Sequence, residues 1–450
     1  MPDDTTQGHT GAPPSDMKAW VVAADMGYGH RRAVHPLRGI AEDGILVVGR
    51  NDAASKGERT LWLRLLRVYE ALSRARGIPV IGKQIFQVLD SLLHIPSFYP
   101  SRNLSRPTFQ VELLDSLIRQ GLCAGMLEHV ATRHLPLVTS FFAPAIAADR
   151  QGTHRVFCII CDADLNRVWV AKEPWDSRIA YFAPCGKAAQ RLKAYGVPEE
   201  RIFLTGFPLP TELLGGPEFP ALRASLGQRL HYLDPAQRFW PLHNRNVEHF
   251  LGGEHCAFRH DRLLTITYAV GGAGAQKEIG ARIAQSLAPR IRAGEVRLNL
   301  MAGTRPEVRE YFTAACAAIA PVSPHLCVYG ADTHDEYFAQ FTSVLRETDI
   351  LWTKPSELSF YCALGIPIIT TPPIGSQERF NRQWLYEMQA GMRQEAPEYA
   401  NEWLFDRLHD GLFAEMAWSG FLKARKLGTY KILEVLHEGR MTRDPSPVIR

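Results

Sequence analysis

One junction between an apolar run and a helical pattern constrains this chain most. Residues 263–270 are apolar and β-branched, residues 271–274 read Gly-Gly-Ala-Gly, and a helical pattern runs from 276 to about 290. The first turn of a helix has backbone N–H groups without intrahelical partners, and glycine lets a phosphate approach them closely. The junction therefore predicts a strand, a turn that can hold a diphosphate, and a helix. A glycine turn that only redirects the chain is the alternative.

Similar units recur on both sides of this junction, because strand-like runs alternate with helical patterns. The predicted strands are 18–24, 137–140, 156–161, 179–184, 201–205, 263–270, 296–301, 326–329 and 350–353. The predicted helices are 107–134, 186–195, 276–290, 306–319, 335–347 and 415–436. Repeated strand–helix units form mostly parallel sheets with helices on both faces. The sequence therefore predicts the α/β class, with two doubly wound domains in 450 residues.

The alternation of strand and helix patterns also predicts the domain organisation. Residues 211–262 interrupt it with prolines, glycines and five histidines that follow no clear period. We expect five segments: a disordered polar tail (1–16), an N-terminal Rossmann-like domain (17–210), a connection with an insertion (211–262), a C-terminal Rossmann-like domain (263–414) and a terminal helix packed back on the first domain (415–450).

Charge and hydropathy exclude several classes of protein. The formal charge of +4 is too small to favour nucleic acid, and no nucleic-acid-reading motif is present. No run of about twenty apolar residues predicts a membrane-spanning helix, and the polar N-terminus is unlike a secretory leader. We therefore expect a cytoplasmic protein.

A basic segment leaves room for a peripheral membrane contact. Residues 56–83 combine seven Lys and Arg residues with leucines and a tryptophan. Such a segment can lie on an anionic membrane surface, or it can be a helix whose arginines face solvent. Both interpretations remain open.

Cysteines and histidines do not predict a metal centre. Cys158 and Cys161 have CxxC spacing, but they stand in an apolar strand whose side chains alternate between faces, so we expect buried thiols. The histidines of residues 231–260 lack a convincing ligand spacing. We predict neither a metal nor a cofactor.

Two polar residues follow strands of the first domain. His30 ends the turn DMGYGH after the first strand, and Asp162 follows the strand that ends at Cys161. Open α/β sheets bind ligands at the carboxyl ends of their strands, and an imidazole can accept a proton near neutral pH. His30 is therefore a candidate general base, with Asp162 binding an acceptor hydroxyl or orienting the imidazole. A histidine that stabilises its turn and an aspartate that caps the next segment are the alternatives.

The second domain carries polar residues at later strand ends. The segment Thr353-Lys-Pro-Ser-Glu357 offers hydroxyls at Thr353 and Ser356, a cation at Lys354 and an acceptor at Glu357. Such groups suit a charged, hydroxyl-rich ligand, whereas a turn that only begins a helix is the alternative.

The order of these motifs resembles one family. A GxGH turn, an Asp after a strand, a GFP turn, a GGxG junction, a Thr-Lys-Pro segment, a GxP turn and a final QExxN resemble the GT-B glycosyltransferases over about residues 18–391. Within them the chain is most similar to monogalactosyldiacylglycerol synthase and to the N-acetylglucosaminyltransferase of peptidoglycan lipid assembly. The resemblance implies two Rossmann-like domains facing each other across a cleft, an acceptor on the first and a nucleotide-sugar donor on the second.

The resemblance also implies roles for particular residues. His30 would be the catalytic base, with Asp162 as the acidic strand end. The loop on the acceptor side would be Gly27, Tyr28 and Gly29. The donor would contact Gly272, Ala273, Gly274, Thr353, Lys354, Gln377, Glu378 and Asn381, and the side-chain chemistry of Ser356 and Glu357 adds these two residues to the expected donor site. The chain departs from the family where Ser356 and Glu357 replace glycines and Cys362 stands near an expected glutamate.

These expectations combine into one predicted activity and two alternatives. The resemblance implies an inverting transfer of a sugar from a nucleoside-diphosphate donor, usually UDP-linked, to an acceptor hydroxyl that a lipid could carry. A nucleotide-sugar 2-epimerase shares the fold and would interconvert donors without an acceptor. A non-catalytic nucleotide-sugar-binding protein of the same fold would bind without turnover.

Overall fold

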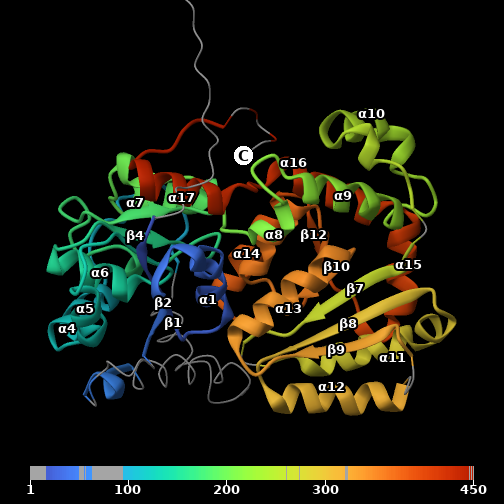
Figure 1. Ribbon diagram of the computed structural model, residues 1–450, viewed down its shortest axis with the longest axis horizontal. Helices are drawn as coiled ribbons and strands as arrows, with labels where there is room; N and C mark the ends of the chain where they lie inside the picture. The colour runs from blue at the N-terminus through green and yellow to red at the C-terminus, as the bar shows by residue number, and fades with distance from the viewer. Residues whose placement is uncertain are drawn as a thin grey trace, which may run out of the picture.

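The computed structural model describes residues 17–49, 55, 57–62, 95–259, 261–272, 274–319, 323–444, 446, 448 and 450. These residues form two sheets of six parallel strands each, in separate lobes (Figure 1). The predicted tail, most of the basic segment 56–83 and Ala273 lie outside the described residues. The fold class is confirmed: the chain is an α/β protein with two Rossmann-like domains.

The first sheet has the order β2-β1-β3-β4-β5-β6. Its strands are β1 (Ala19–Ala24), β2 (Ala41–Val48), β3 (Leu137–Thr139), β4 (Val156–Ile159), β5 (Ala180–Phe182) and β6 (Ile202–Phe203). Its helices are α1 (Tyr28–Val34), α4 (Phe109–Arg119), α5 (Ala124–Val130), α6 (Phe142–Gln151) and α7 (Gly186–Ala194). Strand β2 was not predicted, because charges and a glycine break its apolar pattern.

The second sheet has the order β12-β11-β10-β7-β8-β9. Its strands are β7 (Leu264–Ala269), β8 (Val296–Gly303), β9 (Leu326–Gly330), β10 (Ile350–Thr353), β11 (Ile368–Thr370) and β12 (Gly391–Arg393). Its helices are α11 (Lys277–Ala293), α12 (Pro306–Ile319), α13 (His334–Glu347) and α14 (Ser376–Glu387). Short 3₁₀ helices are η1 (His35–Ile40), η3 (Arg167–Trp169), η4 (Glu199–Arg201), η5 (Gly253–His255), η6 (Glu357–Leu364) and η7 (Pro397–Tyr399).

Each sheet has one place where the strand order reverses, and ligands of open α/β sheets bind there, outside the carboxyl ends. In the first sheet, β1 lies between β2 and β3, so the chain crosses from one side of β1 to the other. In the second, β7 lies between β8 and β10. The predicted motifs follow β1, β7 and β10, so the fold places them at the two reversal points.

Two long helical patterns are each divided in the structure. The predicted helix 107–134 becomes α4 and α5, because Gly121 and Cys123 adopt positive φ between them. The predicted helix 415–436 becomes α16 (Leu412–Lys423) and α17 (Gly428–Glu438), which follow α15 (Ala400–His409). Extended backbone at Ala424 ends α16. Helix α16 packs on η6 of the second domain, whereas α17 lies on the first (Figure 1).

The irregular stretch 211–262 contains helices that the periodicity did not reveal. They are α8 (Thr211–Leu214), α9 (Pro220–Tyr232) and α10 (Trp240–Leu251). Helix α9 buries Arg229 and Gly227 together with its leucines, so its buried face does not read as an apolar stripe. Proline lies in the first turn of both α9 and α10, where its missing N–H costs no hydrogen bond.

The contact of α17 with the first domain gives a stability prediction. A Cβ at Gly428 would collide with the backbone carbonyl of Phe207, so Gly428→Ala should destabilise the protein by about 1–3 kcal/mol. Gly186 begins α7 with no heavy atom within 4 Å of an added Cβ, so Gly186→Ala should leave stability unchanged or raise it slightly. Urea unfolding followed by circular dichroism measures both, and equal midpoints would contradict the packing described.

Candidate functional site

The glycine turns that leave the two sheets touch each other. A Cβ at Gly272, after β7, would lie 3.2 Å from the backbone N of Tyr28 and 3.4 Å from Cα of Gly27, after β1. Glycine at position 272 therefore lets the two domains approach closely without a shift of the Tyr28 backbone. Gly274, in the same turn, has φ of +69°, and its conformation also favours glycine. The carboxyl ends of both sheets thus face one another.

Tyr28 joins the first domain to the second. Its hydroxyl oxygen lies 2.7 Å from the backbone N–H of Thr304, which donates to it, and its ring packs 5.2 Å from that of Tyr337. A Cβ at Gly303 would collide with the Tyr28 hydroxyl. Tyr28 is only 7% exposed, so in this arrangement it forms part of the domain contact.

His30 lies in the first turn of α1, beside the residue that follows β3. Its Nδ1 is 2.7 Å from the carbonyl oxygen of Ser140, and the Ser140 hydroxyl donates back to the His30 carbonyl at 2.6 Å. A carbonyl only accepts, so Nδ1 carries the proton and the lone pair of the neutral ring lies on Nε2. Nε2 makes no hydrogen bond with a described residue. Burial lowers the pKa of His30, which keeps the ring neutral at pH 7.

Asp162 is held by a residue of the other domain. Nδ2 of Asn381 donates to Asp162 Oδ1 at 2.7 Å, and Oδ1 of Asn381 accepts from the Ala163 N–H at 2.8 Å. Asn381 is fully buried. Burial raises the pKa of Asp162 to about 6, assisted by the charges of Glu357 and Glu378, while the Asn381 bond and Lys354 oppose the rise.

The expectation that Asp162 orients His30 needs correction. The described hydrogen bonds of Asp162 run to Asn381, and the imidazole is oriented by the carbonyl of Ser140 instead. Ser140 gave no signal in the sequence, because its contribution is a backbone atom after a short strand. Asp162 still faces the same region, since its pKa responds to Lys354, Glu357 and Glu378.

The side chain of Lys354 extends from the end of β10 over the turn after β7, at the reversal point of the second sheet. Its Nζ lies 2.7 Å from Oε1 of Glu378, and Oε2 of Glu378 accepts from the Ile374 N–H at 2.6 Å. A Cβ at Gly271 would collide with the Lys354 side chain, so the lysine stem lies over the glycine turn. Thr353 is 1% exposed, and its hydroxyl donates to the carbonyl of Ala269 at 3.0 Å.

Glu357 also connects the domains. Its Oε1 lies 3.1 Å from Nε of Arg32, and the guanidinium of Arg32 lies 4.5 Å from the ring centre of Phe341. Both charged side chains are less than a tenth exposed. Arg32 was not predicted from the sequence, because a lone arginine within a helix belongs to no motif.

The remaining predicted residues occupy flanking positions. Gly29 lies against Glu357, whose Oε2 would be 3.1 Å from an added Cβ. Ser356 precedes η6, and its hydroxyl accepts from the Leu358 N–H at 3.4 Å. Gln377 is half-buried in the first turn of α14.

Arg305, which was not predicted, donates from Nε to the Gly272 carbonyl at 2.8 Å and covers one side of the glycine turn. The described parts of the predicted site therefore gather at one junction between domains.

Cys158, Cys161 and His231 have ordinary structural surroundings. Cys158 and Cys161 are buried, as predicted, and burial raises the pKa of both thiols. His231 lies with Nε2 2.6 Å from the carbonyl of Cys256. Within the described ranges, no group of three His, Cys, Asp or Glu residues could hold a metal ion. Over the same ranges, no helix combines the length and apolar character needed to cross a membrane.

Comparison with known proteins gives distant structural likenesses. No protein-family model matches the chain, and no curated protein matches its sequence. The UDP-GlcNAc 2-epimerase from Neisseria meningitidis bound to UDP-GlcNAc is 12% identical, with 94% of this chain and 99% of that chain covered and a TM-score of 0.45. MurG from Acinetobacter baumannii is 13% identical, with 94% and 99% covered and a TM-score of 0.45. HepE from Anabaena in complex with UDP-glucose is 9% identical, with 94% and 99% covered and a TM-score of 0.41.

Asn381 provides a test of the geometry between domains. Asn381→Asp would place a second carboxyl beside Asp162, whereas Asn381→Ala removes the hydrogen bonds without adding charge. The alanine variant should lose about 1–3 kcal/mol. The aspartate variant should lose at least about 3 kcal/mol at pH 8, because an uncompensated buried charge is costly.

The pH dependence distinguishes charge repulsion from lost packing. Crowded carboxyls have raised pKa values, so protonation below about pH 6 relieves their repulsion. The stability gap between the aspartate and alanine variants should therefore widen from pH 5 to pH 8 in urea unfolding. An identical gap at both pH values would contradict the contact.

Proposed function

We propose that this protein is a glycosyltransferase that moves a sugar from a nucleoside-diphosphate donor, with UDP as the first candidate, to an acceptor hydroxyl with inversion. One observation carries the proposal: an imidazole Nε2 of the first domain, to which no described residue is hydrogen-bonded, and a lysine at the reversal point of the second domain lie at the same domain junction. A transferase needs a base on the acceptor side and positive charge on the donor side.

The donor diphosphate would lie against the turn 271–274 and Lys354. Cleavage of the bond between the anomeric carbon and the phosphate oxygen leaves negative charge on the diphosphate. The Lys354 cation and the backbone N–H groups at the start of α11 would stabilise that charge more in the transition state than in the ground state. Glu378 pairs with Lys354 at 2.7 Å and would hold the ammonium in place until the donor arrives.

The acceptor would approach from the side of His30. Nε2 would take the hydroxyl proton as the acceptor oxygen forms its bond to the anomeric carbon and the nucleoside diphosphate leaves. The Nδ1–H bond to Ser140 fixes the ring orientation that leaves Nε2 as the proton acceptor. Asp162 would accept a hydrogen bond from a sugar or acceptor hydroxyl while it is ionised.

A lipid is the first acceptor class to test, and one exposed helix of the first domain supports this choice. Helix α4 exposes Phe109 (70%) and Leu113 (44%) on the face opposite its buried residues. Apolar side chains at successive turns of an exposed helix suit contact with an apolar molecule or surface.

The 2-epimerase remains a second candidate because of Asp162. A carboxyl with a pKa of about 6, near Glu357 and Glu378, can both donate and accept a proton near neutral pH, as elimination and re-addition of the nucleotide require. Incubation of the protein with UDP-sugars and no acceptor separates the two, since an epimerase interconverts donors and a transferase needs the acceptor.

Binding and turnover should respond differently to variants on the two sides of the junction. His30→Asn keeps a donor for the Ser140 carbonyl but removes the base, so release of UDP from a UDP-sugar in the presence of lipid extract should fall by about 10²–10⁴-fold, with little change in affinity. Lys354→Gln should weaken UDP-sugar binding in calorimetry by about tenfold or more. His437→Ala, at an exposed position on α17, is the matched control.

Two results would refute the proposal. The first is no binding of UDP-, GDP- or TDP-linked sugars by the wild-type protein. The second is unchanged turnover in His30→Asn. A wild-type protein that binds nucleotide-sugars without any turnover would instead favour the non-catalytic alternative.

The decrease of kcat/KM at acidic pH should disappear when Asp162 is replaced. The pKa of Asp162 is about 6 and that of His30 lies below its usual value, so kcat/KM should fall as the pH drops through about 6 because Asp162 becomes protonated. Asp162→Asn keeps an acceptor for Asn381 and should lower kcat/KM while removing the inflection near pH 6. If kcat/KM of this variant still falls below about pH 6 as in the wild type, the titrating group is not Asp162.

A further inference from the structure

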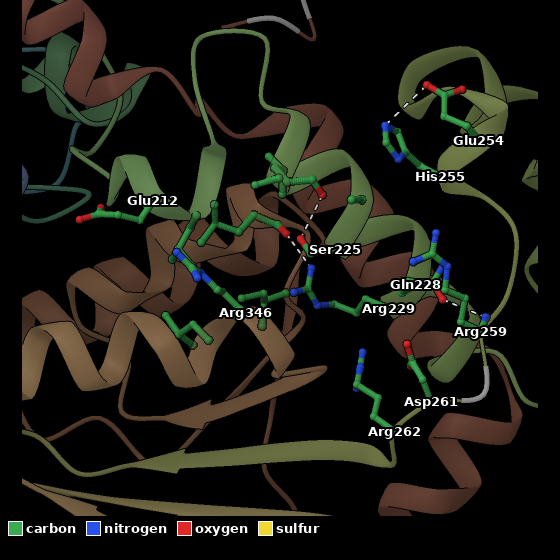
Figure 2. A pocket seen from close by; sticks show the side chains of 17 residues that line it. Glu212, Ser225, Gln228, Arg229, Glu254, His255, Arg259, Asp261, Arg262 and Arg346 are labelled. Atoms are coloured by element: carbon green, nitrogen blue, oxygen red, sulfur yellow. Dashed lines mark hydrogen bonds and ion pairs between the residues drawn. The ribbon is translucent and has the colours of Figure 1, made fainter.

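A second hollow lies at the opposite edge of the C-terminal sheet. It has a volume of about 520 Å³ and is lined by α9, the segment after α10, the end of α13 and the residues between η6 and β11 (Figure 2). Arg262 and Asp349, which precede β7 and β10, mark this as the amino edge. Lys354 lies at the carboxyl edge, so the hollow is separate from the proposed sugar site.

The hollow has walls held by specific contacts. A Cβ at Gly227 of α9 would collide with the carbonyl of His255, so the glycine lets η5 lie directly on the helix. Gln228 Oε1 accepts from the Arg259 N–H at 3.0 Å and ties the following segment to α9. Leucine and isoleucine side chains, including Leu222 and Ile366, give the lining an apolar part.

Arg229 supplies a buried charge that forms no ion pair within the part of the chain that the structure describes. It is 2% exposed, and its guanidinium donates from Nε to the Thr348 carbonyl at 2.8 Å and from Nη1 to the Leu364 carbonyl at 3.0 Å. Nη2 makes no hydrogen bond with a described residue. Carbonyl groups satisfy donors but neutralise no charge, and a buried cation is costly unless an anion pairs with it.

The buried carboxylate nearest in effect to Arg229 is Asp349, whose charge stabilises the Arg229 cation but is shared with a second guanidinium. Asp349 is fully buried and binds Arg262 through two bonds, at 2.6 and 2.7 Å. At the rim, Glu212 pairs with Arg38, and Glu254 lies 3.6 Å from His255.

The other acidic group of the lining, Asp261, is exposed to solvent, which screens its charge. Asp261 accepts from the Tyr232 hydroxyl at 3.3 Å. Arg259 and Arg346, also in the lining, form no ion pair with a described residue. In the view of Figure 2, Arg229 lies between Arg346 and the Gln228–Arg259 contact. The lining therefore carries four arginines against three carboxylates, those of Glu212, Glu254 and Asp261.

We propose that this hollow binds a small molecule that carries a phosphate or carboxylate group on a partly apolar body. The oxyanion lies against Nη2 of Arg229 and is reached by the exposed guanidinium groups of Arg259 and Arg346. Guanidinium groups bind both oxyanions with short, charge-assisted hydrogen bonds. The size of the hollow falls within the range of small-molecule sites.

Phosphate and citrate test the site directly. The melting temperature of the full-length protein is measured with sodium phosphate or sodium citrate against sodium chloride at equal ionic strength. An oxyanion that binds the folded state raises it in proportion to the logarithm of its concentration. The larger rise identifies the preferred oxyanion.

Variants assign the binding to this hollow. The exposed pair Arg259→Ala and Arg346→Ala, combined, should weaken oxyanion binding by about tenfold and leave the melting temperature in chloride unchanged. Arg229→Lys keeps the charge but loses the planar set of N–H donors of the guanidinium group, so it should weaken oxyanion binding as well. Arg282→Ala, an exposed arginine on α11, is the control.

Three outcomes would overturn the proposal. These are no rise with either oxyanion, an equal rise in the double variant, and a rise that Lys354→Gln abolishes. The last would place the ion at the proposed sugar site. Because Lys354→Gln affects only that site, failure here and failure of the proposed function are distinguishable.

Discussion

The close contact of two glycine turns controls the arrangement of this molecule. A Cβ at Gly272 would lie 3.2 Å from the backbone N of Tyr28, so a side chain there would push the turns of the two domains apart by a few tenths of an ångström. With that contact in place, Arg32 reaches Glu357 and Asn381 reaches Asp162. Each of these bonds joins residues more than two hundred positions apart. The junction therefore depends on backbone packing first and on polar bonds second.

The polar bonds at the junction bring opposite chemical roles together. The first domain contributes a neutral imidazole and a carboxyl of raised pKa, and the second contributes a lysine held by Glu378. The low exposure of Arg32 and Glu357 strengthens their attraction but makes separation costly, since each charge would lose its partner. Entry of a donor between the domains must therefore compete with these bonds or leave them intact.

The sequence predicted the architecture better than the local roles. Apolar runs and glycine turns revealed nine of the strands, because a parallel strand buried on both faces reads as a continuous apolar run. Strand β2, with Glu42, Asp43 and Gly44, lacked that pattern. The helices of 211–262 were missed because their buried faces contain polar or small residues such as Arg229 and Gly227.

Candidate residues were found where a motif met a strand end, as with His30, Asp162 and Lys354. The groups that position them were not found, because they act through backbone atoms or from distant segments. The carbonyl of Ser140 orients His30, and Arg32 engages Glu357. Neither interaction has a pattern in a single sequence, since each depends on the three-dimensional placement of the domains.

The most direct measurement is the structure of the protein with UDP bound. We expect diphosphate density beside the glycine turn after β7, within hydrogen-bond distance of Lys354 Nζ and of backbone N–H groups at the start of α11, with the nucleoside at the carboxyl edge of the second sheet. Density at Arg229 on the amino edge, or a helix start at α11 closed by its own side chains with no nucleotide beside it, would contradict the account.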